Sequence, residues 1–114
     1  MAHYDTAIIR IALPTAVECK GSATGADAHD HVREYLADVG GGWTEWVARG
    51  GWENDDGELV RERVRMYECA LDGREGEPEH ARMHARVLAD ELAFITTEDV
   101  IMWQVVPASH GFED

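Results

Sequence analysis

Residues 40–52, GGGWTEWVARGGW, place three of the chain's four tryptophans between two glycine clusters. Glycine readily adopts the left-handed backbone conformation that ends helices, so we expect the first cluster to close a helix. The residues that follow, 43–49, are expected to form a strand, and the second cluster opens a hairpin loop over residues 50–58. Because side chains alternate along a strand, Trp43 and Trp46 should point to opposite faces of the sheet.

The segments on either side complete a β-α-β-β-α-β order. Hydrophobic patterning predicts strands at residues 6–13, 43–49, 59–71 and 99–107 and helices at residues 27–39 and 79–94. Crossover helices between strands favour the ferredoxin-like arrangement, an α+β fold whose four-stranded antiparallel sheet has the spatial order 4-1-3-2 and carries both helices on one face. We expect one such domain over residues 1–114, with residues 108–114 as a flexible tail.

The second predicted helix carries an apolar stripe. Its members, which lie roughly one turn apart, are Met83, Val87, Leu88, Glu91 and Phe94 or Ile95, and Ala85 and Ala89 fill the near side of the stripe. We expect this stripe to pack on the sheet.

The third predicted strand, residues 59–71, separates its side chains by charge. Arg61, Arg63 and Arg65 alternate with apolar residues, so the two sets project to opposite faces. A row of like charges needs partners. These are either the abundant carboxylates of this chain or a carboxylate or phosphate ligand.

Glu62 and Glu68 share the register of the apolar residues on the same strand. A buried carboxylate is costly unless it is paired, and its pKa rises. Either a one-residue bulge turns these side chains outward, or Glu62 is a functional acid at a junction between subunits.

The helix-free face of the expected sheet is apolar. Ile8 on the first strand and Val100, Met102 and Val106 on the last strand contribute to it, and the last strand lies at the edge of the sheet. A bare apolar edge invites pairing, so we expect a homo-oligomer, with a trimer favoured over a dimer. Trp52, near the hairpin turn, suits an interface or a site that stacks on a ligand ring.

The composition limits the partners and the location. The formal net charge of −13 argues against nucleic acid, because phosphate neutralisation needs a basic face. No apolar run approaches the roughly 18 residues of a membrane span. The N-terminal residues lack the features of a signal peptide, so we expect a cytoplasmic protein. Cys19 and Cys69 lie far apart, and we expect neither a metal nor a cofactor.

Arginine supplies nine of the ten basic residues. This bias suits a GC-rich source such as an actinobacterium, its phage or a halophilic archaeon.

Two stretches resemble a known group, the PII-like small ferredoxin-like proteins, and within it the phage S-adenosylmethionine lyase. Residues 41–45, GGWTE, are similar to that family's Gly-x-aromatic-x-Glu turn into a strand. Residues 62–69, ERVRMYEC, are similar to its glutamate followed by a Val-Arg run that ends in cysteine. The resemblance covers residues 40–106 as a pattern. It implies a trimer that binds small molecules, often adenine nucleotides, in clefts between subunits.

The same resemblance implies a reaction and roles for two residues. The carboxylate of S-adenosylmethionine attacks the substrate's own methylene carbon next to the sulfonium, and the protein mainly orients the substrate. Glu62 would be the polar anchor and Trp43 a wall of the site.

We therefore expect a site at the subunit junction. The predicted ligand-binding residues are Trp43, Glu45, Trp52 and Arg63, the predicted catalytic residue is Glu62, and the preferred ligand is S-adenosylmethionine or an adenine nucleotide. Two other functions fit the same pattern. One is a non-enzymatic protein that binds a host or defence protein, and the other is a dimeric α+β barrel enzyme whose two sheets enclose a cavity.

Overall fold

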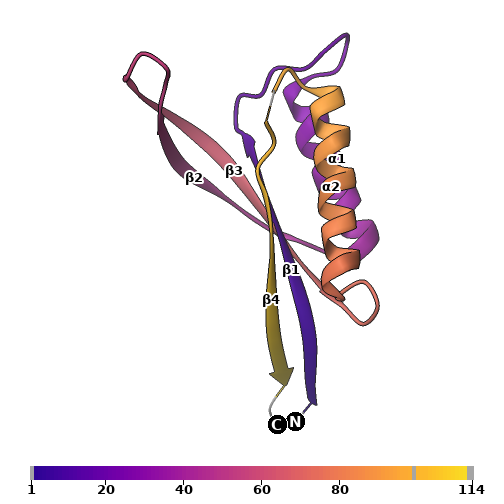
Figure 1. The fold of residues 1–114 in the computed structure, drawn as a ribbon. Coiled ribbons are helices and arrows are strands. Elements are labelled where there is room, and N and C mark those ends of the chain that lie inside the picture. The colour runs from indigo at the N-terminus through magenta and orange to yellow at the C-terminus, as the bar shows by residue number, and fades with distance from the viewer. Residues whose placement is uncertain (1, 99, 113–114) are drawn as a thin grey trace.

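The computed structural model describes residues 2–98 and 100–112, with side chains for residues 6–98 and 100–107. The elements in chain order are β1 (Ala2–Pro14), α1 (Gly25–Gly40), β2 (Thr44–Glu53), β3 (Leu59–Asp72), α2 (Pro78–Ile95) and β4 (Trp103–Phe112). The strands form one antiparallel sheet in the order β2-β3-β1-β4, and both helices lie on one side of it (Figure 1). This confirms the ferredoxin-like α+β fold and the strand order expected from the sequence.

Both ends of α1 are set by residues that cap helices. The Thr24 side chain accepts a hydrogen bond from the backbone N–H of Asp27, and the Asp27 carboxylate accepts one from the backbone N–H of Thr24, which forms a capping box. At the other end Gly41 has a φ of 77°, and its N–H donates to the carbonyl of Ala37. Gly40 lies so close to β3 that a Cβ atom there would overlap the Cys69 sulfur.

The hydrophobic core lies between the helices and the helix-facing side of the sheet. α1 packs on β3, and α2 packs on β1 and β4. The fully buried large side chains of this core are Ile9, Ile11, Leu13, Val32, Leu36, Tyr67, Leu71, Leu88 and Leu92.

α2 turns only part of the predicted stripe to the sheet. Met83, Val87 and Phe94 are 47%, 40% and 82% exposed, so these three members of the stripe lie outside the core. Ala85, Leu88 and Ala89 are buried as the pattern predicts, and Ala81, which the pattern did not include, is fully buried as well. Small side chains allow a helix to lie close to a sheet, and α2 therefore presents its alanines inward.

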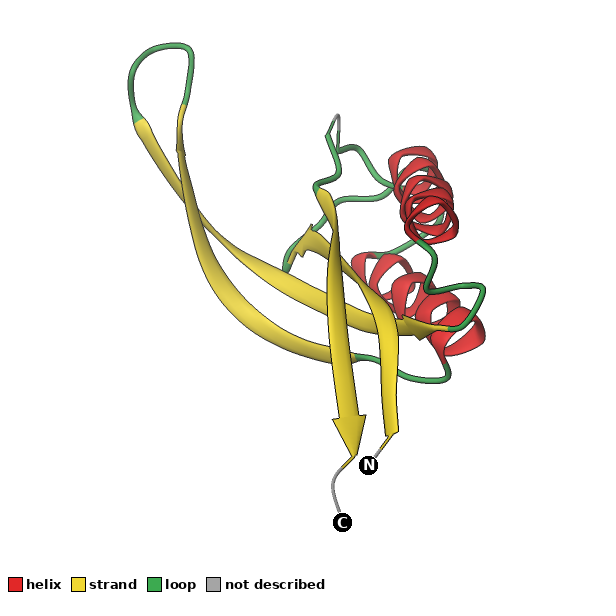
Figure 2. Cartoon of the chain, turned by 60° about the horizontal axis from the view of Figure 1, so that its bottom comes forward, coloured by secondary structure: helices red, strands yellow, loops and turns green. Residues whose placement is uncertain are grey.

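The hairpin of β2 and β3 is longer than predicted. β2 continues through Gly50 and Gly51, which we expected in the loop, and the turn is confined to residues 54–58. Figure 1 shows the end of this hairpin, residues 49–63, projecting beyond the helices, and we call this segment the arm. Figure 2 shows that the arm bends toward the side of the sheet that carries the helices.

β4 is displaced toward the C-terminus relative to the prediction. It begins at Trp103 and runs to Phe112, so the strand continues past residue 108, where we expected the tail to start. Asp99, the expected first residue of this strand, lies outside the described residues, as do residues 113–114 of the expected tail.

Gly40→Ala is expected to lower the free energy of unfolding by about 1–3 kcal/mol, because the new Cβ must displace the Cys69 side chain or the strand behind it. Gly42→Ala is the matched control. Its Cβ position has nothing within 4 Å and its φ is not positive, so we expect a change below about 0.5 kcal/mol. Urea denaturation followed by tryptophan fluorescence measures both. Equal losses would contradict the close packing of Gly40 on β3.

Candidate functional site

The five predicted site residues lie on both faces of the sheet. β2 pairs with β3 without interruption along its whole length, so no bulge reverses the alternation of side chains. Glu62 and Trp52 lie on the helix-free face, whereas Glu45 and Arg63 lie on the face that carries the helices. Trp43 precedes β2, is 40% exposed and lies beside Glu45.

Glu45 is held between two arginines. Arg33 of α1 donates from Nε and Nη2 to its two carboxylate oxygens at 3.1 and 3.0 Å, and Arg65 of β3 donates from Nη1 at 3.4 Å. The hydrogen bonds from Arg33 hold the pKa of Glu45 below its usual range. The indole Nε1 of Trp43 lies 3.5 Å from the same carboxylate. The contacts of Glu45 therefore tie α1 to the hairpin, and a role in ligand binding stays a prediction.

His29 and Tyr67 form a buried polar pair next to this group. Nδ1 of His29 lies 2.6 Å from the Tyr67 hydroxyl, and Nε2 lies 3.0 Å from the carbonyl oxygen of Pro14. Because a carbonyl only accepts, Nε2 carries the proton and Nδ1 accepts from the tyrosine. Burial lowers the pKa of His29 and raises the pKa of Tyr67 to about 12. The pair is neutral at pH 7 and fixes α1 against the sheet.

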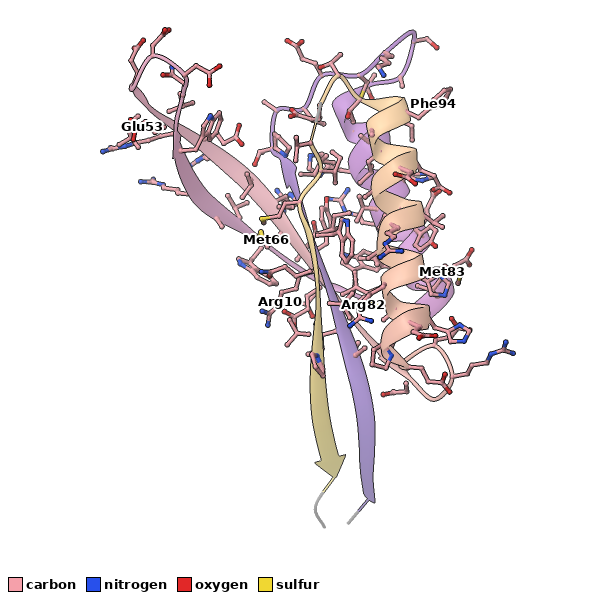
Figure 3. The ribbon with its side chains drawn as sticks, in the orientation of Figure 1. Arg10, Glu53, Met66, Arg82, Met83 and Phe94 are labelled. Carbon is pink, nitrogen blue, oxygen red and sulfur yellow. The ribbon has the colours of Figure 1, made fainter. Side chains whose placement is uncertain are left out.

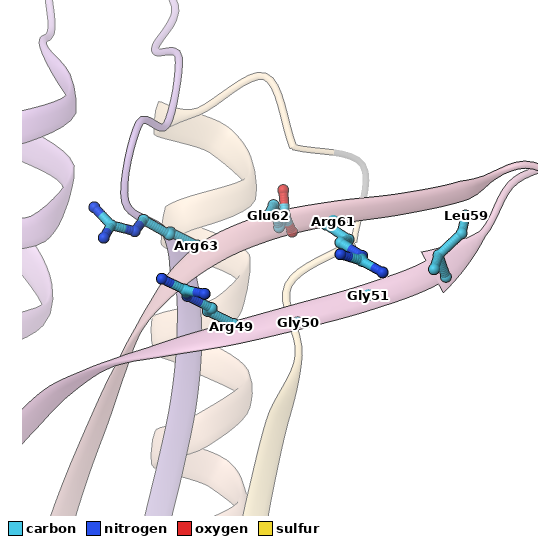
Figure 4. Close-up of a pocket in the computed structure, with 7 residues that line it drawn as sticks. All are labelled: Arg49, Gly50, Gly51, Leu59, Arg61, Glu62 and Arg63. Carbon is cyan, nitrogen blue, oxygen red and sulfur yellow. The ribbon is translucent and has the colours of Figure 1, made fainter.

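The arm carries a hollow with a volume of about 550 Å³. Arg49 pairs directly across from Arg63, and Arg61 pairs across from Gly51, so the three guanidinium groups share one face of the hairpin. Figure 4 shows Arg49 and Arg63 extending toward the same end of the hairpin. The lining residues all come from the two strands of the arm: Arg49, Gly50, Gly51, Leu59, Arg61, Glu62 and Arg63.

Glu62 and Arg63 also border a second hollow at the base of the arm. Its volume is about 380 Å³, and Pro14, Thr15 and Ala16 complete its lining. The backbone N–H of Thr15 donates to the carbonyl of Arg63 at 3.0 Å, which fixes the arm to the segment after β1. The predicted catalytic residue and one predicted ligand residue thus lie between two hollows.

The helix-free face of the sheet is apolar and open. Trp46 and Trp52 are 39% and 47% exposed. Arg10 donates to Glu68 at 2.8 Å on this face, so Glu68 is paired within the chain. For Glu62, no hydrogen bond or ion pair of the side chain is found in the described part of the chain. The register adds further apolar residues to this face: Ile8, Ala48, Val60, Val64, Met66 and Val106.

Sequence reasoning missed Arg49 and the two glycines beside it. The alternation at residues 61–65 is visible in the sequence, but the register that places Arg49 opposite Arg63 is not. Predicting the turn at residues 54–58 would have revealed this register. A hairpin centred on residue 56 places Arg49 opposite Arg63. Arg65, the third member of the predicted row, binds Glu45 instead.

Histidines on the helices pair with neighbouring side chains. His31 Nε2 lies 2.5 Å from a carboxylate oxygen of Glu91, and His84 contacts both Glu75 and the hydroxyl of Tyr35. No group of three or more His, Cys, Asp or Glu side chains is placed to hold a metal ion within the described residues.

In the same part of the chain, no helix combines the length and the apolarity needed to cross a membrane. Figure 3 shows the side chains of residues 6–98 and 100–107.

No protein-family model, curated protein or solved structure matches this chain. The ferredoxin-like fold is identified by its own strand order and helix placement. Because one fold supports many unrelated activities, the fold does not define the function, and the local chemistry of the arm and of the open face bears on it instead.

Lowering the pH from about 7 to about 5 is expected to destabilise the protein through His29. Its folded-state pKa is depressed, so the neutral side chain stabilises the fold above the unfolded-state value of about 6.5. That stabilisation is lost as the pH falls toward the folded-state pKa. The contribution to the free energy of unfolding is at most about 1.4 kcal/mol per pH unit for one proton.

His29→Gln does not titrate and should flatten this slope, whereas His80→Gln, on α2 outside the core, should retain it. Urea denaturation at several pH values in this range gives the slope for each protein. A slope in His29→Gln as steep as that of the unmodified chain would show that other groups cause the loss.

Proposed function

We propose that the protein is a self-associating, PII-like ligand-binding protein whose small-molecule site is the hollow on the arm. The observation that carries this proposal is the hollow itself, because its volume is that of a small-molecule site. All of its lining residues belong to the arm, and none belongs to a helix. Two residues singled out from the sequence, Glu62 and Arg63, line it. The ligand classes are those that the sequence resemblance implies, an adenine nucleotide or S-adenosylmethionine.

The lining combines the two kinds of group that small-molecule sites use. Arg49, Arg61 and Arg63 offer guanidinium donors for anionic groups, and Leu59, which is 64% exposed, offers an apolar surface for a ring. Glu62 offers a carboxylate without a partner among the described side chains. This mixture supports binding of a molecule that is polar at one end and flat at the other.

Cleavage of S-adenosylmethionine is the reaction that we propose if the ligand is this molecule. The substrate carboxylate forms a C–O bond to its own methylene carbon while the C–S bond breaks, and methylthioadenosine leaves with the bonding electron pair. No protein nucleophile takes part, so the protein contributes orientation. Glu62 is the proposed anchor, because its negative charge suits the cationic groups of the substrate.

The open face supports self-association. Trp46 and Trp52 are exposed on it, and the charges of Arg10 and Glu68 near its centre neutralise each other. In a chain with a net charge of −13, this is a face on which two copies meet with little repulsion. A trimer is the preferred assembly. A face-to-face dimer would correspond to the α+β barrel alternative.

Trp46→Glu is expected to dissociate the assembly, because it places a charge on the apolar face. Val47→Glu is the matched control, since it adds the same charge one residue away on the opposite face, where Val47 is 47% exposed. Native mass spectrometry gives the number of subunits in each case. A monomeric unmodified protein, or equal dissociation by both variants, would contradict association through the open face.

A thermal-shift panel of adenosine, AMP, ADP, ATP and S-adenosylmethionine is expected to show stabilisation by at least one member. A ligand at about one hundred times its dissociation constant adds about 2.7 kcal/mol of stability, which corresponds to a shift of several degrees. Chromatography of a mixture with S-adenosylmethionine tests for methylthioadenosine, and Glu62→Gln should abolish its formation. If none of the compounds raises the melting temperature, the result favours the alternative of a non-enzymatic interaction protein.

A further inference from the structure

We infer that the arm recognises the diphosphate or triphosphate group of a small molecule. The recognising surface is Arg49, Arg61 and Arg63 around Gly51, which we call the arginine face. The inference rests on the proposed function, since it uses the same hollow, and it adds the chemical class of the ligand.

The arginines of this face lie together without carboxylate partners. Arg49 is directly opposite Arg63, and like charges in opposite positions destabilise a strand pair. None of the three arginines makes an ion pair in the described part of the chain. By contrast, Arg10, Arg33 and Arg65 each have a carboxylate oxygen within 3.4 Å. With 23 acidic residues in the chain, partners are plentiful, so a cluster left unpaired indicates an anion from outside.

Gly50 and Gly51 are a second, independent observation. Neither has a positive φ, and an added Cβ atom would meet nothing closer than 3.5 Å at either position. Neither backbone conformation nor packing therefore requires glycine, which costs roughly 0.5–1 kcal/mol relative to alanine inside a strand. Gly51 lies across from Arg61 on the arginine face, so its missing side chain keeps the floor of the hollow open (Figure 4).

Adjacent phosphates match this surface better than other anions. A carboxylate has two coplanar oxygens that a single guanidinium fork can satisfy. Two or three linked phosphates present tetrahedral oxygens to donors in several directions, and their charge is comparable to that of three guanidinium groups. The exposed Leu59 in the lining leaves apolar surface for the remainder of the molecule.

The charge of the chain limits the size of this anion. A nucleic-acid strand would extend beyond the hollow over a protein with a net charge of −13, so the favoured ligand is a small molecule. Of the two ligand classes of the proposed function, the arginine face therefore favours the adenine nucleotide over S-adenosylmethionine, whose sulfonium and ammonium groups are cationic.

The binding test is isothermal titration calorimetry of the full chain with adenosine, ADP, ATP, inorganic pyrophosphate and citrate. We expect pyrophosphate to bind on its own and ATP to bind at least about tenfold more tightly than adenosine, since each charge-assisted hydrogen bond contributes on this scale. Raising the salt concentration from about 50 to about 200 mM should weaken binding of both anions, because exposed charges are screened.

Two double variants separate the arginine face from net charge. Arg49→Gln with Arg63→Gln should weaken pyrophosphate binding at least tenfold and also raise the melting temperature, because it removes a repulsion. Arg82→Gln with Arg86→Gln removes the same charge from exposed positions on α2 and should change binding less than about twofold. Gly51→Val keeps every charge but fills the hollow, so it should weaken binding while the fold stays intact.

The outcomes divide clearly. Equal weakening in both double variants, or citrate binding as tight as that of pyrophosphate, would overturn the phosphate inference. Adenosine or S-adenosylmethionine binding that does not depend on the arginines would overturn it while leaving the proposed function in place. If no compound binds, the phosphate inference and the proposed small-molecule site both fall, and a change of subunit number in the arginine variants would assign the arginines to assembly instead.

Discussion

The carboxylate of Glu45 is the contact on which the arrangement of layers depends. It belongs to β2, accepts from Arg65 of β3, and accepts two bonds from Arg33 of α1, so three elements meet at one group. Ion pairs that are partly withdrawn from water cost hydration, and two arginines sharing one carboxylate offset that cost. Beyond Glu45 in the direction of Arg49, the helices no longer cover the hairpin, and both of its faces are exposed (Figure 1).

Much of the fold could be predicted because it depends on local patterns. The capping box of Thr24 with Asp27 and the glycines that end α1 are readable in the sequence, and the element order leaves few topologies. The arm could not be predicted in full, because glycine in a strand contradicts propensity and only the pairing of β2 with β3 reveals it. For the same reason the sequence pointed to Glu62 and Arg63 but not to Arg49. On α2, Ala85 and Leu88 were predicted to face inward, but the burial of Ala81 and the exposure of Met83 depend on how close the helix lies to the sheet, which periodicity alone does not specify.

The core and the arm differ in how well local and global preferences agree. In the core, apolar residues, caps and strand pairing all favour the same structure. On the arm, opposed arginines, glycines within a strand and an exposed Trp52 each oppose stability. Natural proteins retain such conflicts where function requires them, so their concentration in one hairpin supports the proposal that the arm carries the binding site.

The arm is a single pair of strands, so the arginine face and the tryptophan-bearing face are two sides of one ribbon. A two-stranded ribbon bends and twists more freely than a wide sheet. Bending that draws the guanidinium groups together moves the side chains on the tryptophan-bearing face apart. Bending in the opposite direction moves the guanidinium groups apart. If the arm binds a ligand on one side and associates through the other, as proposed, occupancy and association are linked thermodynamically. By that linkage, the factor by which assembly changes the affinity for a ligand is the factor by which the ligand changes assembly.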